Sequence, residues 1–461
     1  MKKFVIAAFA ALSVAMSAGA AAPNPEFMDR AVIYEVNLRQ GTPTRDLKGA
    51  QRELPRLRDL GVDIVWLMPI HPISELNRKG TLGSYYAVKD YKAVNPEFGT
   101  MEDLKEYVRT AHALGMKVIL DEVCNHTGCD NAWVTEHPEY YARNEKGEMF
   151  GPFDWTDTYK LDYSNPATRA AMADALKFWV AEADIDGYRC DVAGEVPTDF
   201  WEEVRPQLEA IKPVFMLAEA DKPELLNNAF DADYAWPMKD LFNDIAATQG
   251  VNAYAAKEGQ KRARKTAKDI RDLVEKTDTP KGAVHMQMVT NHDLNTWEGT
   301  EFERYGKGLG AFAVLSYTLP GMTMMYTGQE VGFNHPFEFF ETDEVIPDYS
   351  ANDITTFYKM LNSLKHNHKA LGALPCKKGC CESGIEWIPT EGKNFSDQVV
   401  AFSRKKGSDE VIVIVNLSDK EAKLTNSALP ARTAALTEYF AGAPVQLPET
   451  LAPWQFLIFT K

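Results

Sequence analysis

Three acidic residues stand at the ends of three separate apolar runs of this chain. They are Asp191 in Gly187-Tyr-Arg-Cys-Asp-Val, Glu219 in Val214-Phe-Met-Leu-Ala-Glu, and Asp293 in Met288-Val-Thr-Asn-His-Asp. Several carboxylates that converge in one cleft are the groups that cleavage of a glycosidic bond requires. The sequence therefore predicts a catalytic site built from the ends of strands.

The neighbours of these acids indicate which of them would be ionised and which would be protonated. Arg189 is two residues from Asp191, so both side chains share one face of the strand, and a nearby guanidinium lowers the pKa of a carboxyl group. The apolar run before Glu219, with negative charge nearby, should raise the pKa of Glu219. We therefore expect Asp191 to stay ionised and Glu219 to hold its proton near neutral pH.

A fourth run, Val118-Ile-Leu-Asp-Glu-Val-Cys-Asn-His126, has the same design and precedes the other three. Each motif alone has a structural explanation: Arg189 and Asp191 could form an ion pair at a strand end, and Glu219 could cap a helix. Four such motifs in order, each at the end of a strand, favour a catalytic site over these separate explanations.

The elements that would position these residues form a regular series. Apolar, β-rich runs alternate with helical patterns, such as the one that begins at Met101, has Thr100 and Asp103 in capping-box spacing, and ends at Gly115. Alternation favours a parallel sheet, and catalytic-type residues at many strand ends favour a closed α/β barrel, a (β/α)8 TIM barrel, over an open sheet. The eight runs cover residues 32–36, 64–68, 118–120, 188–192, 214–217, 230–236, 285–290 and 322–326.

Two segments interrupt this series. Residues 127–160 are rich in aromatic and turn residues and predict a short lobe inserted after the third strand. Residues 372–461 contain short β runs separated by Gly, Pro, Asn and Asp, and predict a C-terminal antiparallel β-domain, a β-sandwich. The catalytic barrel would then occupy residues 23–371, with the lobe inside it.

Composition and the N-terminal residues narrow the class of protein. The chain has 461 residues, 45% of them hydrophobic, and a formal net charge of −16, which argues against a nucleic-acid partner. Lys2 and Lys3, an apolar stretch over residues 4–16 and small residues at 17–22 predict a secretory signal peptide over residues 1–22. We expect export to the periplasm or the extracellular space, with no membrane span.

Six cysteines are present, and their number does not fix a pairing. Cys124 and Cys190 alternate with inward-pointing strand residues, so we expect them to face outward beneath the helices as small buried hydrophobes. Cys376, Cys380 and Cys381 could form a local disulfide, remain thiols or hold a metal, although their spacing matches no zinc pattern well.

With these motifs in this order, the chain resembles the α-amylase family of retaining α-glycoside hydrolases (glycoside hydrolase family 13). The similarity runs from Ile33-Tyr-Glu-Val to Leu451-Ala-Pro-Trp-Gln-Phe-Leu. The resemblance implies that Asp191 is the nucleophile, that Glu219 is the general acid and then the base, and that Asp293 stabilises the transition state.

The resemblance also implies a set of substrate-binding residues. Arg189 would orient Asp191, Tyr86 would stack on the reacting sugar, and Asp90 would support the site. The full set is Tyr86, Asp90, His126, Arg189, Asn291 and His292, with Asp121 and Asn125 completing the third-strand motif. The aromatic residues Trp133, Trp155 and Trp297 could line sugar subsites or could serve packing.

The chain departs from the family pattern in three respects, one of which is the shortness of the inserted lobe over residues 127–160. Many relatives bind Ca²⁺ between barrel and lobe, but Lys160 stands where an Asp ligand would be, and an ammonium cannot ligate a hard cation. A shift in register would restore Asp162 as a ligand; we nevertheless expect no structural calcium and no cofactor. Gly194-Glu195 replaces a Lys-His pair on the leaving-group side, so binding beyond the cleavage point should differ.

These expectations combine into one leading hypothesis. The chain would be an exported, monomeric hydrolase that cleaves α-1,4-glucosidic bonds in starch or malto-oligosaccharides with retention. The alternative is a glucanotransferase or an oligosaccharide-specific α-glucosidase with the same site. A non-catalytic carbohydrate binder is disfavoured because all three carboxylates are present.

Overall fold

The computed structural model describes residues 25–277, 284–374 and 384–461. Its centre is a closed barrel of eight parallel strands in the order β1-β10-β9-β8-β7-β6-β3-β2, which confirms the predicted TIM barrel and its eight strands. The signal-peptide residues 1–22 and Cys376, Cys380 and Cys381 lie outside the described residues. The strands are β1 Val32–Val36, β2 Ile64–Leu67, β3 Lys117–Glu122, β6 Gly187–Cys190, β7 Phe215–Ala218, β8 Ala232–Tyr234, β9 Val284–Gln287 and β10 Met322–Tyr326.

Alternate residues of each strand point into the barrel, because the side chains of a strand have a period of two. Ile33, Ile119 and Phe215 belong to the apolar cluster inside the barrel, whereas Cys124 and Cys190 belong to the cluster between strands and helices. Both cysteines are fully buried free thiols, as predicted. The inward positions nearest the carboxyl ends of the strands are polar, so polar side chains gather at one end of the barrel.

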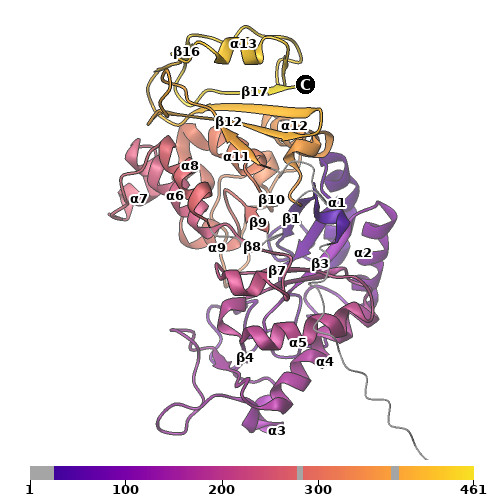
Figure 1. Cartoon of the computed structure of the whole chain (residues 1–461). Helices are drawn as coiled ribbons and strands as arrows, with labels where there is room; N and C mark the ends of the chain where they lie inside the picture. The colour runs from indigo at the N-terminus through magenta and orange to yellow at the C-terminus, as the bar shows by residue number, and fades with distance from the viewer. Residues whose placement is uncertain (1–24, 278–283, 375–383) are drawn as a thin grey trace, which may run out of the picture.

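Helices surround the barrel (Figure 1). The predicted ends of α2 are confirmed: the Asp103 amide donates to Thr100 Oγ1 at 3.2 Å, the Thr100 amide donates to Asp103 Oδ2 at 2.9 Å, and Gly115 has a φ of +77°. The larger helices are α1 Leu47–Leu60, α2 Met101–Ala113, α4 Pro166–Glu182, α5 Thr198–Glu209, α6 Trp236–Thr248, α8 Ala267–Lys276, α11 Leu309–Thr318 and α12 Asp353–Asn367. Shorter ones are α7 Ala253–Lys257, α9 His292–Trp297 and α10 Glu301–Tyr305.

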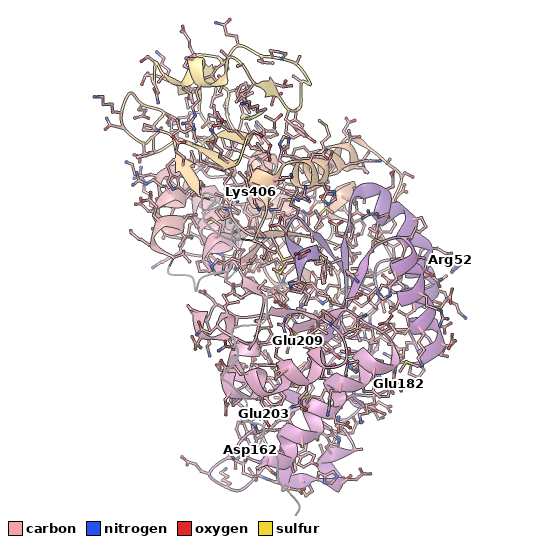
Figure 2. The ribbon with its side chains drawn as sticks, turned by 45° about the vertical axis from the view of Figure 1, so that its right-hand side comes forward. Arg52, Asp162, Glu182, Glu203, Glu209 and Lys406 are labelled. Carbon is pink, nitrogen blue, oxygen red and sulfur yellow. The ribbon has the colours of Figure 1, made fainter. Side chains whose placement is uncertain are left out.

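The outer faces of these helices are charged. Arg52 on α1, Glu182 on α4 and Glu203 on α5 are exposed at the outer surface (Figure 2). Among the described residues, no helix combines the length and the apolar character that a membrane crossing requires.

The inserted lobe is held at its base by a short antiparallel pair. Strand β4, His126–Gly128, pairs with β5, Thr158–Lys160, so that His126 lies opposite Lys160. Between them lies the short helix α3, Trp133–Glu136, which is found beside α4 at the lower end of Figure 1. The lobe therefore stands over one side of the barrel end.

The C-terminal part is an antiparallel β-domain, as predicted. It contains a five-stranded sheet of order β11-β12-β13-β17-β15 and a two-stranded sheet of β14 and β16, which share one apolar cluster. The domain lies at the opposite end of the molecule from the lobe (Figure 1). Its elements are β11 Ile385–Trp387, β12 Val399–Lys406, β13 Asp409–Asn416, β14 Ala422–Lys423, α13 Leu429–Thr433, β15 Thr437–Glu438, β16 Thr450–Leu451 and β17 Phe456–Thr460.

Candidate active site

Three buried carboxylates surround a single guanidinium at the carboxyl end of the barrel. Arg189 Nη1 lies 2.7 Å from Asp121 Oδ1 and 3.0 Å from Asp191 Oδ1, and Arg189 Nη2 lies 2.9 Å from Glu219 Oε2. Strands β3, β6 and β7 are neighbours in the barrel, so the side chains at their ends meet. Arg189 is fully buried beneath these acids and is held by Tyr234, whose hydroxyl oxygen accepts from Nε at 3.1 Å.

A strained residue links two of these acids. Val192, directly after Asp191, has a φ of +35°, which is rare for a β-branched residue. Its amide donates a hydrogen bond of 2.7 Å to Glu219 Oε2. Because Oε2 also pairs with Arg189, Oε1 of Glu219 is the oxygen that can carry a proton towards the cleft.

His292 connects the third predicted acid to the barrel interior. Its Nδ1 lies 2.5 Å from Glu35 Oε1, its Nε2 lies 2.8 Å from the Tyr86 hydroxyl, and its Nε2 lies 3.3 Å from Asp293 Oδ2. The Tyr86 hydroxyl also donates to Asp121 Oδ2 at 3.1 Å. One chain of contacts therefore joins Asp293 to the Arg189 cluster.

The pKa values of the two central acids differ from the expectation in one respect. We predicted that Arg189 would keep the pKa of Asp191 low, but burial raises it to about 6, since Asp121 and Asp293 add to the burial effect and together these outweigh the guanidinium. Burial also raises the pKa of Glu219 to about 7, against the lowering by Arg189 and with further raising by Asp191 and Asp293. The predicted order, with Asp191 the stronger acid, remains.

The two histidines of the cleft carry different charges. Burial lowers the pKa of His126 to about 3, so its ring is neutral near pH 7. Burial would also lower the pKa of His292, but Asp293 and Glu35 outweigh it and raise the value to about 9, so that His292 is protonated. His292 is therefore a cation that can donate from both ring nitrogens.

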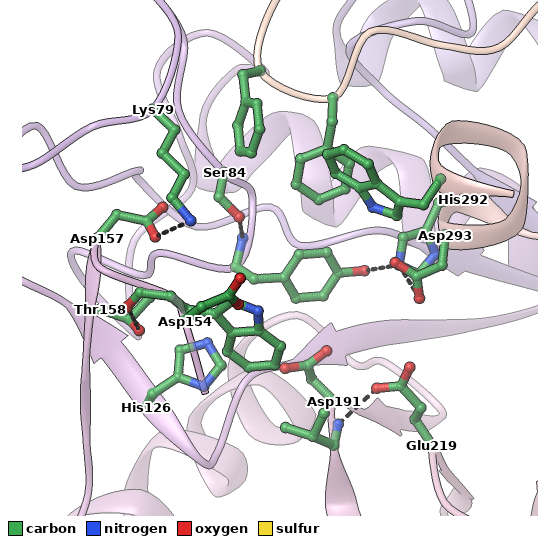
Figure 3. A pocket seen from close by; sticks show the side chains of 16 residues that line it. Lys79, Ser84, His126, Asp154, Asp157, Thr158, Asp191, Glu219, His292 and Asp293 are labelled. Carbon is green, nitrogen blue, oxygen red and sulfur yellow. Dashed lines mark hydrogen bonds and ion pairs between the residues drawn. The ribbon is translucent and has the colours of Figure 1, made fainter. Parts of the chain in front are cut away.

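These groups open into a pocket of about 500 Å³ (Figure 3). Asp191 and Glu219 lie near one another in the wall, and an ion pair of 3.3 Å joins Lys79 to Asp157 at a distance from them along the pocket. Trp155 and Trp297 line the pocket, and their place at sugar subsites stays a prediction. The other lining residues are Ser84, Tyr86, His126, Asp154, Thr158, Val192, His292, Asp293, Phe339 and Phe340.

Asp90, Asn291 and Trp133 are not among the residues that line this pocket. Asp90 is exposed, accepts from the Lys92 amide at 2.9 Å and faces a different hollow, so it does not support this pocket. Asn291 is fully buried and accepts from the Leu294 amide at 2.8 Å, which makes it the N-cap of α9 and not a ligand of substrate. Trp133 lines the same hollow as Asp90.

The sequence analysis missed residues that hold the site from below. Glu35 fixes His292, and the Trp66 Nε1 donates to Asp121 Oδ2 at 3.2 Å. A signal for Glu35 was present: it is an acid at an inward position of an otherwise apolar strand, where an unpaired charge would be costly. Such a residue requires a partner, and here the partner is His292.

A closed parallel barrel whose strand ends bring together carboxylates with raised pKa values, within a cleft lined by aromatic rings, is the arrangement expected of a glycoside hydrolase. The model of the alpha-amylase catalytic domain matches residues 33–160 and 139–370. The chain belongs to the α-amylase family of glycoside hydrolases.

Known relatives agree with this assignment. An alpha-amylase of Haloarcula japonica is 27% identical over 91% of this chain, and Alpha-amylase 3 of Dictyoglomus thermophilum is 26% identical over 86%. The chain covers 60% of the length of the first and 86% of the second. The crystal structure of an alpha-amylase from Lactobacillus plantarum is 28% identical, with a TM-score of 0.78, over 94% of this chain and 99% of that one.

Proposed function

We propose that this chain hydrolyses α-1,4-glucosidic bonds in starch or malto-oligosaccharides with retention of configuration. The observation that carries the proposal is the pair formed by Asp191 and Glu219 on one guanidinium, with the higher pKa on Glu219. Two acids that share one guanidinium are consistent with the separation of about 5–5.5 Å that a retaining pair needs. The names of relatives, which include a maltogenic alpha-amylase of Bacillus acidopullulyticus and cyclomaltodextrinases, support an α-glucan substrate.

The chemistry would proceed in two displacements. The Asp191 carboxylate attacks the anomeric carbon while the bond from that carbon to the leaving oxygen breaks, and Glu219 gives its proton to that oxygen. Glu219, now a carboxylate, then takes a proton from water, and the water oxygen forms a bond to the anomeric carbon as Asp191 leaves. Asp293 and protonated His292 would hold hydroxyl groups of the reacting sugar.

Product analysis tests this proposal. The purified protein is incubated with maltoheptaose and with soluble starch, and products are separated by chromatography over time. Shortening of both to maltose and glucose is the expected result. A folded protein that leaves both substrates intact would require a different α-glucoside as substrate.

Transfer is the second candidate function for the same site. In transfer, a sugar hydroxyl replaces water in the second displacement, so the residues involved do not change. A relative named alpha-1,4-glucan:maltose-1-phosphate maltosyltransferase, 26% identical over 96% of this chain, supports keeping this candidate. Products longer than the substrate at rising acceptor concentration would favour transfer over hydrolysis.

We further propose that the lobe does not depend on a structural calcium ion. Lys160 Nζ lies 3.9 Å from Glu195 Oε2, so an ammonium that pairs with an acid stands where the Asp ligand would be, and Asp162 Oδ1 accepts from the Ser164 amide at 2.9 Å. Among the described residues, no group of three or more His, Cys, Asp or Glu side chains could hold a metal ion.

A chelator tests this proposal. Thermal unfolding with EDTA should show the same midpoint as thermal unfolding without it, because Lys160 stands at the position of an Asp ligand and an ammonium cannot ligate a hard cation. The control is unfolding with added Ca²⁺ in the absence of EDTA. A midpoint that falls with EDTA and recovers with Ca²⁺ would contradict the proposal.

Export and a monomeric state remain proposals as well. Export rests on the signal-peptide pattern of residues 1–22. The monomeric state rests only on the class of protein that the sequence indicates. N-terminal sequencing of the protein recovered outside the cytoplasm should begin near residue 23, and light scattering should give the mass of one chain. Recovery of the uncut chain from the cytoplasm, or the mass of a dimer, would contradict these proposals.

A further inference from the structure

A second hollow, of about 630 Å³, lies outside the catalytic pocket. It is formed by the lobe, by α4 and by the segment that follows Tyr86 in the chain. Among its lining residues are Asp90, Tyr91, Trp133, His137, Tyr140 and Asp174. None of these lines the catalytic pocket, so the hollow is a separate feature.

Four aromatic rings in mutual contact border this hollow; Tyr91 and Tyr140 are buried, so Trp133 and His137 are the rings that a ligand can reach. The Trp133 ring lies 5.0 Å from the Tyr91 ring and 5.5 Å from the Tyr140 ring, between centroids. His137 stacks on Tyr140 at 4.6 Å with an interplanar angle of 8°. Trp133 is half-buried and the His137 side chain is 45% exposed, so part of this wall faces solvent. Such a wall suits a ligand with an apolar face.

The lysines of the hollow are paired with acids, and Asp90 is left as an exposed carboxylate that can accept hydrogen bonds from hydroxyl groups. Lys92 pairs with Asp174, and Lys89 lies 3.0 Å from Glu75 and 3.5 Å from Asp130. A charged ligand would have to break these pairs, whereas hydroxyl groups can bond to them without doing so. The chemistry therefore favours a neutral ligand that is rich in hydroxyl groups and has an apolar face, which describes a sugar.

The hollow and the catalytic pocket are built from the same two segments. The segment around residues 84–92 supplies Tyr86 to the pocket and Asp90 to the hollow. The lobe supplies Trp155 to the pocket and Trp133 to the hollow. A polymer bound in the hollow would therefore be held near the cleft, which raises its effective concentration there.

From these observations we propose that the hollow walled by Trp133, His137 and Tyr140 is a non-catalytic binding site for α-glucan chains. The identity of the ligand rests on the proposed function, because the same polymer would serve the catalytic pocket. Its effect would be confined to long substrates, since a short oligosaccharide in the cleft gains nothing from a second anchor.

Calorimetric titration counts the sites. The full chain with Glu219→Gln, which slows turnover by about 10²–10⁴-fold, is titrated with maltoheptaose, and two molecules per chain are expected. The double variant Glu219→Gln with Trp133→Ala should bind one. A count of one for the first variant, or of two for the second, would overturn the proposal.

Kinetics separate the site from the cleft. In the otherwise unchanged enzyme, Trp133→Ala should raise the KM for soluble starch about tenfold, or about 1.4 kcal/mol, and leave kcat/KM for maltotriose unchanged. His137→Ala removes an exposed ring, should act in the same direction, and provides the test where Trp133→Ala fails to fold. Trp133→Phe, which keeps a ring against Tyr91, is the control for packing and should have the smaller effect.

The outcomes distinguish the two proposals. If the enzyme without substitutions is inactive on both starch and maltotriose, the proposed function is refuted, whatever the titration gives. Normal activity on maltotriose, together with an unaltered KM for starch in both Trp133→Ala and His137→Ala, would refute the second site alone.

Discussion

At the scale of single residues, the behaviour of the site follows from one buried cation among several acids. Arg189 contacts Asp121, Asp191 and Glu219. One positive charge cannot compensate three negative charges in a buried setting, so the pKa values of the acids rise: to about 6 for Asp121 and Asp191 and to about 7 for Glu219. This is how a proton can remain on Glu219 near neutral pH.

The first prediction concerns the two central acids. Asp191→Asn should abolish turnover of maltoheptaose, because an amide cannot form the covalent intermediate. Glu219→Gln should lower kcat by about 10²–10⁴-fold, the usual contribution of general acid–base catalysis. The matched control is Asp59→Asn, which alters an exposed acid on α1 that lines neither the pocket nor the second hollow and should leave kcat on maltoheptaose unchanged. Turnover close to that of the unchanged enzyme in Asp191→Asn would exclude it as the nucleophile.

The second prediction concerns pH. As pH rises through about 7, Glu219 loses the proton that the leaving oxygen needs; as pH falls through about 6, Asp191 gains a proton and ceases to be a nucleophile. The profile of kcat/KM against pH should therefore be bell-shaped, with a maximum between these values and with apparent pKa values that belong to the coupled pair. A rate at pH 9 equal to the rate at pH 6.5 would contradict this assignment.

At the scale of elements, buried ion pairs fix the helices to the strands that carry the site. Arg205 on α5 donates to Asp231 Oδ2 at 3.0 Å, and the same oxygen accepts from the Met216 amide of β7 at 2.8 Å. Asp231 directly precedes β8. One carboxylate therefore joins α5, β7 and β8, next to the strand that ends in Glu219.

The third prediction follows from this junction. Asp231→Ala should lower the stability by about 3–5 kcal/mol, since it leaves the buried Arg205 guanidinium without its partner. Urea unfolding followed by circular dichroism measures the change. Asp199→Ala, which removes an exposed partner of Arg169, is the control and should cost about 0–1 kcal/mol. Equal midpoints for the two variants would show that the junction adds no stability.

At the scale of the whole molecule, the β-domain is attached to the barrel through a buried arginine. Arg404 on β12 donates to the Thr318 carbonyl at 3.1 Å and to the Gly372 carbonyl at 3.2 Å. Thr318 ends α11, so the contact satisfies an acceptor at a helix terminus that would otherwise be buried without a donor. The domain thereby rests on helices α8 and α11 of the barrel, at the opposite end of the molecule from the lobe (Figure 1).

The fourth prediction concerns this attachment. Arg404→Ala should lower the midpoint of urea unfolding, because each carbonyl that loses its buried donor costs about 1–3 kcal/mol. Activity on maltoheptaose in the absence of urea should remain, since the cleft is far from the interface. Arg432→Ala, which breaks a partly exposed pair with Glu386, is the comparison and should have little effect. A midpoint unchanged by Arg404→Ala would mean that other contacts carry the attachment.

Much of the fold could be predicted from the sequence, because the strands are continuous apolar runs and the caps of α2 are local patterns. The acids at the strand ends were identified for the same reason: each follows its own apolar run. Asp90 and Asn291 were misplaced because their surroundings depend on tertiary contacts, an exposed hollow for one and the N-cap of α9 for the other. Glu35 was missed because its partner, His292, is 257 positions away in the chain.

The barrel, the β-domain and the acids that enter the cleft follow from local patterns in the sequence, since period-two alternation decides which side of a strand each residue faces. The electrostatics of the site depend on tertiary packing. Whether Arg189 lowers the pKa of Asp191 below its usual value depends on the other acids that share the guanidinium and on how deeply they are buried. Those quantities are set by the packing of strands β3, β6 and β7 against one another, which no local pattern contains.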